Sequence, residues 1–171
     1  MSESTPRDGI ARLKDDHRKV KELFEEFERA NGVGRKEKLA REICLELLVH
    51  TAIEEEIFYP ACAGKVDEDK LKEGFVEHDT AKLLIAEIEG AAGADDDFFD
   101  TKVHVLQEEV EHHIEEEEKR GEGIFAQARK ADLDFDALGE RMAARKLELA
   151  AEYKAKGLPK PKLTTMDEVA V

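Results

Sequence analysis

The stretch HTAIEEEIFYP, residues 50–60, places a histidine and a glutamate four positions apart within a pattern of apolar residues. Residues four apart lie on one face of an α-helix, so His50 and Glu54 point to the same side. The apolar residues around them recur at steps of three and four, which predicts a helix from about Arg35 to Tyr59 that ends at Pro60. The inward stripe of this helix consists of Leu39, Ile43, Leu47, His50, Glu54 and Ile57.

The same motif returns in HHIEEEE, residues 112–118, within a predicted helix from about Asp96 to Arg120. Two registers are open there, His112 with Glu116 or His113 with Glu117. Only His113 and Glu117 continue the inward stripe of that helix, so this register is favoured. The stripe consists of Val103, Leu106, Val110, His113 and Glu117.

Each of these helices is preceded by a predicted helix that carries one inward histidine. The first runs from about Asp8 to Ala30 and contains His17. The other begins near Asp67, a plausible N-cap, contains His78 and closes at Gly90 and Gly93. The two halves of the chain therefore repeat one order: a histidine, then His-x-x-x-Glu.

Four helices of similar length with short connections predict an all-α fold, an antiparallel up-down-up-down four-helix bundle. A further pattern from about Asp136 to Lys156 predicts an additional C-terminal helix, packed outside the bundle or against a partner. The expected organisation is a flexible N-terminus over 1–7, the bundle over 8–130, the additional helix over 131–156 and a flexible tail over 157–171.

Composition limits the partners. Of the 171 residues, 40% are charged and the formal net charge is −15, which disfavours nucleic acid and anionic membranes because phosphate is neutralised by Lys and Arg. The sequence holds no apolar segment of the roughly 20 residues that a membrane span needs. Cys44 and Cys62 show no metal-binding spacing, and Cys44 lies among apolar residues. We expect a cytoplasmic protein, as a monomer or homodimer.

The inward polar residues are expected to meet. A helix rises about 1.5 Å per residue, and antiparallel packing then brings the four histidines to nearly one level, with Glu54 and Glu117 one turn away. Buried carboxylates without partners are destabilising by several kcal/mol each, and no inward Lys or Arg lies at this level. A bound cation is the simplest compensation, and a mixed set of imidazoles and carboxylates favours a dinuclear iron-type site.

The alternative is a purely structural bundle, since one histidine in an apolar stripe is more often a hydrogen-bonded core residue than a ligand. Four at one depth with two glutamates favour the metal site. A ferritin-like di-iron site would need Glu-x-x-His on two helices, and the sequence offers only Glu109 to His112, off the inward stripe.

DDH at 15–17, HTAIEEEIFYP at 50–60, EHD at 77–79 and HHIEEEE at 112–118 resemble the HHE cation-binding domains of the hemerythrin-like family, over about residues 8 to 130. The resemblance implies a pair of iron ions (Fe²⁺/Fe³⁺) beside a bridging water, hydroxide or oxo group. By this resemblance His17 and His50 bind one iron, His78 and His113 bind the other, and Glu54 and Glu117 bridge them.

The pattern departs from that of oxygen-carrying hemerythrins. Those proteins have a second histidine one turn from the ligand on the third helix, whereas Gly74 and Lys82 flank His78 here. An iron lacking that ligand can keep water, recruit Glu77, or react with peroxide, NO or O₂. The expected function is to handle or sense iron or these small oxidants.

Two further functions stay open. One is an iron-dependent interaction or regulatory module without turnover. The other is a catalase-like or peroxidase-like enzyme, for which Tyr59 is a candidate redox neighbour, although core packing explains that tyrosine as well. No separate catalytic acid or base is recognisable in the sequence.

Overall fold

The structure is a computed structural model that describes residues 8–90 and 96–167. Its regular elements within those ranges are all helical. They are α1 (Gly9–Arg29), α2 (Val33–Ile53), the π-helical turn η1 (Glu54–Phe58), α3 (Tyr59–Cys62), α4 (Glu68–Gly90), α5 (Phe99–Glu118), α6 (Ile124–Arg129) and α7 (Phe135–Lys156).

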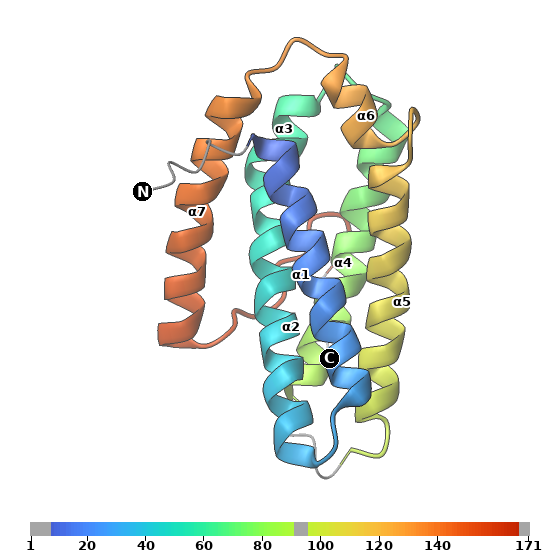
Figure 1. The fold of residues 1–171 in the computed structure, drawn as a ribbon, viewed down its shortest axis with the longest axis vertical. Coiled ribbons are helices and arrows are strands. Elements are labelled where there is room, and N and C mark those ends of the chain that lie inside the picture. The colour runs from blue at the N-terminus through green and yellow to red at the C-terminus, as the bar shows by residue number, and fades with distance from the viewer. Residues whose placement is uncertain (1–7, 91–95, 168–171) are drawn as a thin grey trace.

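Helices α1, α2, α4 and α5 form an up-down-up-down bundle (Figure 1). Two hairpins build it, because α1 packs on α2 and α4 packs on α5, while α2 contacts α4 and α1 contacts α5 between the hairpins. Helix α7 lies outside, along α1 and α2. The structure therefore confirms the all-α class, a helical bundle with an additional C-terminal helix.

Side chains fix several helix starts where the sequence indicated them. The Asp8 carboxylate accepts a hydrogen bond from the Ala11 amide at 2.9 Å, and Asp67 accepts from the Asp69 amide at 2.9 Å. Gly32, with φ of +91°, turns the chain into α2, which begins at Val33 rather than Arg35.

The helical path of α2 does not end at Pro60. It continues through η1 and α3 to Cys62, with Pro60 in the first turn of α3. The sequence analysis also did not anticipate the short helix α6. Both differences concern the end of the bundle where α3 and α6 lie (Figure 1).

The core consists of two apolar clusters with a polar layer between them. On α1, Leu13 belongs to one cluster and Val20 to the other, and His17 lies between them. On the next helix, Leu47 and Ile57 belong to different clusters in the same way and enclose His50 and Glu54. The bundle thus holds its inward histidines and glutamates between two layers of hydrophobic packing.

The segment after α7 runs back along the bundle towards α4 (Figure 1). The sequence predicts a flexible tail over 157–171, whereas residues 164–166 donate hydrogen bonds to Asp79 of α4. Residues 168–171, like the N-terminal 1–7, lie outside the described residues.

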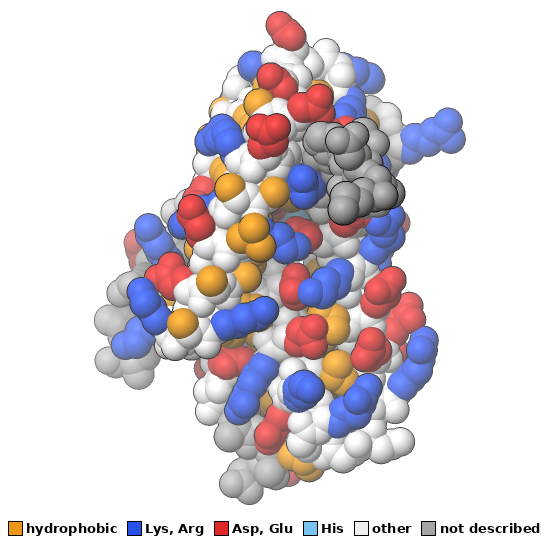
Figure 2. Space-filling model, turned by 60° about the vertical axis from the view of Figure 1, so that its left-hand side comes forward, with side chains coloured by type: hydrophobic (Ala, Val, Ile, Leu, Met, Phe, Trp, Pro, Cys, Tyr) orange, Lys and Arg blue, Asp and Glu red, His pale blue; other side chains and the backbone are white. Residues whose placement is uncertain are grey.

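Acidic and basic side chains intermingle over the face shown in Figure 2. In the part of the chain that the structure describes, no helix is both long and apolar enough to cross a membrane.

Candidate metal centre

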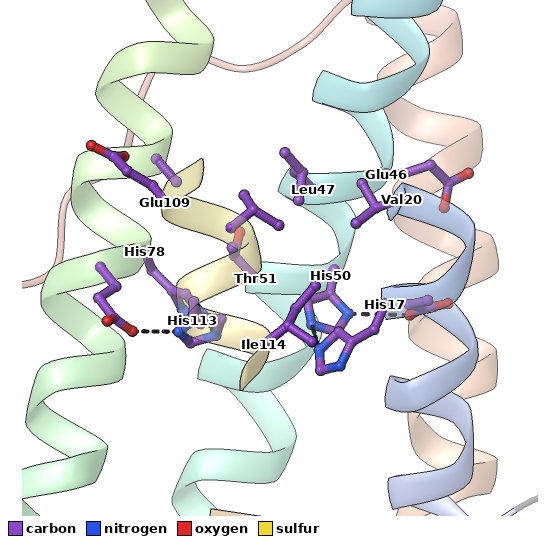
Figure 3. A pocket seen from close by; sticks show the side chains of 14 residues that line it. His17, Val20, Glu46, Leu47, His50, Thr51, His78, Glu109, His113 and Ile114 are labelled. Atoms are coloured by element: carbon purple, nitrogen blue, oxygen red, sulfur yellow. Dashed lines mark hydrogen bonds and ion pairs between the residues drawn. The ribbon is translucent and has the colours of Figure 1, made fainter. Parts of the chain in front are cut away.

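Each hairpin brings two histidines together at the level of the polar layer. His17 of α1 and His50 of α2 face each other with their Nε2 atoms 3.2 Å apart. His78 of α4 and His113 of α5 repeat this arrangement at 3.3 Å. All four side chains are buried. Figure 3 shows the two pairs facing a common interior.

Two carboxylates connect the pairs across the hairpins. Glu54 places Oε1 3.1 Å from Nε2 of His50 and Oε2 3.0 Å from Nε2 of His78. Glu117 places Oε2 3.4 Å from Nε2 of His17 and Oε1 3.5 Å from Nε2 of His113. Each carboxylate therefore reaches one histidine of each pair.

These carboxylates lack the hydrogen bonds that their burial demands. Both oxygens of Glu54 and Oε2 of Glu117 have no hydrogen-bond partner among the described residues, although Glu54 is 0% exposed and Glu117 is 2% exposed. Their ion pairs within 8–90 and 96–167 are with histidines only. Unpaired buried oxygens beside converging imidazole nitrogens fit a bound cation.

Two overlapping groups could each hold a metal ion. One contains His17, His50, Glu54 and Glu117, and the other contains Glu54, His78 and His113, with the ligand atoms of each group within 4.8 Å of one another. Glu54 belongs to both. No cysteine joins either group in the part of the chain that the structure describes.

A second carboxylate holds the outer nitrogen of each histidine. Nδ1 of His17 donates to Glu118 at 2.7 Å, and Nδ1 of His50 donates to Asp16 at 3.3 Å. Nδ1 of His78 donates to Glu55 at 3.1 Å, and Nδ1 of His113 donates to Glu77. A hydrogen bond of this kind fixes the tautomer with the proton on Nδ1 and leaves Nε2 free to bind a metal. All four imidazoles therefore present Nε2 to the interior.

Without a metal, the site holds its charge in imidazolium–carboxylate pairs. Burial opposes protonation of His50, but the charge of Glu54 and the hydrogen bond to Asp16 outweigh it and raise the pKa of His50 to about 10. The pKa of His113 is also raised despite burial, mainly by the charge of Glu117. Burial works against ionisation of Glu54 too, yet the charge of His50 and the surrounding imidazoles keep its pKa well below its usual value.

The sequence profile of the hemerythrin HHE cation binding domain matches residues 8–128. The chain belongs to this family. A crystal structure of a hemerythrin HHE cation binding domain-containing protein from Mycobacterium kansasii shares the fold with a TM-score of 0.72, at 20% sequence identity over 89% of this chain and 95% of that one.

A DNA nickase from Nostoc sp. is 29% identical to this HHE protein over 103 residues, which make up 60% of this chain and 29% of the nickase. The chain thus spans less than a third of the nickase's length.

Tyr59 adds a hydroxyl group to the edge of the site in this HHE domain. It donates to Oε1 of Glu117 at 2.7 Å and stacks on His78, with ring centroids 5.3 Å apart. The π-helical turn explains its direction, because an i→i+5 bond from the Tyr59 amide to the Glu54 carbonyl brings Tyr59 towards the face that carries Glu54. In a regular α-helix that position faces elsewhere.

Gly74 leaves the room that Tyr59 fills. A Cβ atom at Gly74 would lie 2.7 Å from the Tyr59 hydroxyl. Gly74 is one of the two positions at which the sequence lacks the second histidine of oxygen-carrying hemerythrins. The other, Lys82, turns its Nζ to Glu55 rather than to the centre, at 2.8 Å.

A small cavity lies beside the four histidines. Its volume is about 30 Å³, and apolar side chains line much of it, among them Val20, Leu47 and Ile114 (Figure 3). This is room for one or two water-sized molecules.

The structure brings together all six side chains that the sequence indicated: His17, His50, Glu54, His78, His113 and Glu117. His112 lies outside with its side chain 61% exposed, in an exposed group with Glu73 and Glu77. Glu77, considered from sequence as an extra ligand, instead accepts from the outer nitrogen of His113.

Sequence reasoning missed the outer carboxylates. In the sequence Glu55 and Glu118 are members of acidic runs, a pattern typical of solvated faces, but their side chains are only 16% and 33% exposed and accept hydrogen bonds from His78 and His17. Their position directly after Glu54 and Glu117 was the available signal. Asp16 similarly precedes His17, yet it serves His50 of the neighbouring helix.

Proposed function

We propose that this HHE protein is a non-haem di-iron protein that handles or senses iron or small oxidants such as O₂, peroxide and NO. The metal-binding unit in this proposal is the bundle, residues 8–130. The proposed ligands are His17 and His50 for one iron, His78 and His113 for the other, with Glu54 and Glu117 bridging the pair beside a water, hydroxide or oxo group.

The observation that carries the proposal is the position of Glu54. Its two oxygens lie buried without hydrogen bonds, one at each histidine pair. A carboxylate that ligates one ion through each oxygen would satisfy both, whereas an ion bound at one histidine pair would leave the Glu54 oxygen at the other pair without a ligand bond. Imidazole with carboxylate and no thiolate suits iron better than it suits a structural zinc site.

The cavity supports a small reactant. About 30 Å³ beside the histidines admits a molecule of two or three heavy atoms and excludes a larger substrate. Bound iron would supply redox and Lewis-acid chemistry there. The chain's own residues orient the imidazoles through their Nδ1 hydrogen bonds, keep bulk water away with apolar side chains, and hold one proton on the Tyr59 hydroxyl against Glu117.

Turnover is a separate question from metal binding. Within the described residues, Tyr59 is the proton-bearing hydroxyl that contacts a proposed ligand, and without metal, burial with the charge of Glu117 raises its pKa well above the usual value. A catalase-like or peroxidase-like activity is the second candidate, with Tyr59 as the neighbouring hydroxyl. Cytoplasmic location and the oligomeric state stay predictions.

The nicking activity of the Nostoc relative is outside the proposal. The match covers 29% of that protein, and a net charge of −15 disfavours contact with a phosphate backbone.

The test is the iron content per chain, measured together with near-ultraviolet absorption, after growth in iron-supplemented cells. Wild type should contain about two irons and show charge-transfer bands. His50→Ala should lose the iron assigned to His17 and His50, and with it the charge-transfer bands of the bridged pair, while His104→Ala, which removes an exposed histidine away from the centre, should match wild type. A folded wild type that is free of metal and refuses added ferrous iron would refute the proposal.

A further inference from the structure

The chain beyond the bundle reaches the carboxylates that orient the histidines. Two parts of it do so: helix α7 and the segment of residues 158–167 that follows it, here called the C-terminal strap. Neither part supplies a proposed metal ligand. Both, however, hold a carboxylate that accepts a hydrogen bond from an imidazole Nδ1.

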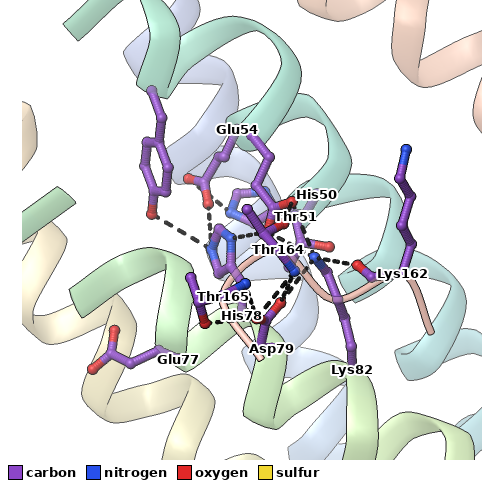
Figure 4. Close-up of polar contacts among 12 residues, drawn as sticks. His50, Thr51, Glu54, Glu77, His78, Asp79, Lys82, Lys162, Thr164 and Thr165 are labelled. Carbon is purple, nitrogen blue, oxygen red and sulfur yellow. Dashed lines mark hydrogen bonds and ion pairs between the residues drawn. The ribbon is translucent and has the colours of Figure 1, made fainter. Parts of the chain in front are cut away.

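The strap is anchored on Asp79 of α4. This carboxylate is 0% exposed and accepts the backbone N–H groups of three successive strap residues, Thr164 at 2.9 Å, Thr165 at 2.6 Å and Met166 at 3.1 Å. The Thr165 hydroxyl donates to it as well, at 2.7 Å. Figure 4 shows the bonds from Thr164 and Thr165 converging on Asp79, one residue after His78. The anchor therefore places the strap beside the centre.

From this anchor the strap reaches Glu55. The Thr164 hydroxyl donates to Oε2 of Glu55 at 3.0 Å, while Oε1 of Glu55 accepts from Nδ1 of His78 at 3.1 Å. Lys82 donates to both Glu55 oxygens and also to the carbonyl of Lys162 in the strap, at 3.2 Å. One line of hydrogen bonds therefore runs from Thr164 of the strap through Glu55 to His78 in the interior.

Helix α7 makes the corresponding contact on the other hairpin. Lys146 donates to Oδ1 of Asp16, whose Oδ2 accepts from Nδ1 of His50 at 3.3 Å. The carboxylates behind His17 and His113 differ, because the side-chain hydrogen bonds of Glu118 and Glu77 within the described ranges are to histidines of the bundle. One histidine in each pair is therefore held from outside.

We propose that residues 135–167 are a positioning element of the metal centre. Thr164 of the strap adjusts the metal affinity of the His78/His113 half, and Lys146 of α7 adjusts that of the His17/His50 half. This inference rests on the proposed dinuclear site. An outer carboxylate fixes the orientation and basicity of a ligating imidazole, and its loss lowers metal affinity about 10–100-fold. Because each contact serves one pair, the two metal affinities are tuned separately.

The coupling is reciprocal. If the strap favours metal binding at His78, metal binding must favour the docked strap by the same factor. Loading the centre should therefore slow amide hydrogen exchange at Thr164, Thr165 and Met166, which donate to Asp79.

The test uses Co²⁺ as the probe metal and full-length chains, with the two binding constants taken from calorimetry and visible absorption. Thr164→Ala should weaken one of the two sites by roughly 3-fold, less than the 10–100-fold expected for loss of Glu55 itself because Lys82 still holds that carboxylate, and should leave the other site unchanged. Lys146→Ala should weaken the other site. Thr164→Ser should restore wild-type binding, and Lys160→Ala, an exposed change in the strap, should have no effect.

A background variant identifies the half-site. Thr164→Ala should have no effect on the single site that remains in a His113→Ala chain, but should keep its full effect in a His17→Ala chain. The unfolding free energy of the metal-free chain serves as the structural control, since a general loss of packing would lower it and weaken both sites together.

The outcomes separate the two claims. Equal weakening of both sites, or no change in either, overturns the positioning role while the dinuclear centre stands. A serine variant that fails to restore binding also overturns it. A folded wild type that binds no Co²⁺ overturns the proposed centre and this inference with it.

Discussion

Replacing Glu54 by glutamine tests whether one carboxylate serves two ions. Glutamine keeps the shape of the side chain but replaces one oxygen by an NH₂ group that cannot ligate. Glu54 is the one residue present in both candidate groups, whereas Glu117 belongs to the first. The Glu54→Gln variant therefore keeps one ligating oxygen, which can serve only one of the two ions, and the other ion loses a ligand.

The size of the expected effect on stability follows from the linkage between metal binding and folding. Free metal at 100 times each dissociation constant stabilises the wild-type chain by about 2.7 kcal/mol per site, or about 5 kcal/mol in all. In the variant, a site that is 100-fold weaker contributes only about 0.4 kcal/mol at the same metal concentration, while the other site keeps about 2.7 kcal/mol. At roughly 2–4 °C per kcal/mol, the metal-induced rise in Tm should fall from about 10–20 °C to about 6–12 °C.

Thermal unfolding with and without Co²⁺, monitored by circular dichroism, measures this difference. Glu115→Gln is the matched control, because it makes the same substitution at an exposed position of α5. Its metal-induced shift should equal that of wild type. A Glu54→Gln chain that still binds two ions and keeps the full shift would refute the bridging role of Glu54.

Three further predictions concern the metal-free chain, each measured by urea unfolding. The pKa of His50 rises from 6.5 to about 10 on folding, so protonated His50 stabilises the folded chain fully below pH 6.5, and this contribution is lost as pH rises through about 10. An unfolding free energy that instead increased over this range would contradict the assigned pairing. Tyr59→Phe leaves Oε1 of Glu117 without its hydroxyl donor and should lower the unfolding free energy by about 1–3 kcal/mol, a loss that should shrink when metal is bound. Gly74→Ala places a Cβ 2.7 Å from the Tyr59 hydroxyl and should lower the unfolding free energy. Overpacking destabilises by about 1–3 kcal/mol, which should exceed the gain of about 1 kcal/mol in helix propensity. A stabilised variant would show that Tyr59 moves freely.

The periodicity of apolar residues was sufficient to predict the bundle and to place six polar side chains inside it. Two hairpins with one repeated order leave few other arrangements, and depth along each helix follows from residue counting. Tyr59 could not be placed in the same way, because its direction depends on a π-helical turn that breaks the regular period at Glu54.

The outer carboxylates and the strap were beyond sequence reasoning for a different reason. Glu55 looks like any glutamate of a solvated run until Lys82 and Thr164 are found beside it, 27 and 109 residues along the chain. Contacts at such separations leave no local pattern. The residues 157–167, rich in Pro, Lys and Thr, resemble a tail by composition, and their contacts with Asp79, Glu55 and Lys82 explain why they lie against the bundle.

The exchange of carboxylates between hairpins has a consequence for the order of assembly. The α1–α2 hairpin, continued by η1, carries His17, His50 and Glu54, and the α4–α5 hairpin carries His78, His113 and Glu117. Each forms from neighbouring stretches of chain and can gather its own three side chains early, at low contact order. The second contact of each carboxylate is made only when the hairpins dock. A bound ion would then link two hairpins that fold separately. Two chains that exchanged hairpins would form two complete centres.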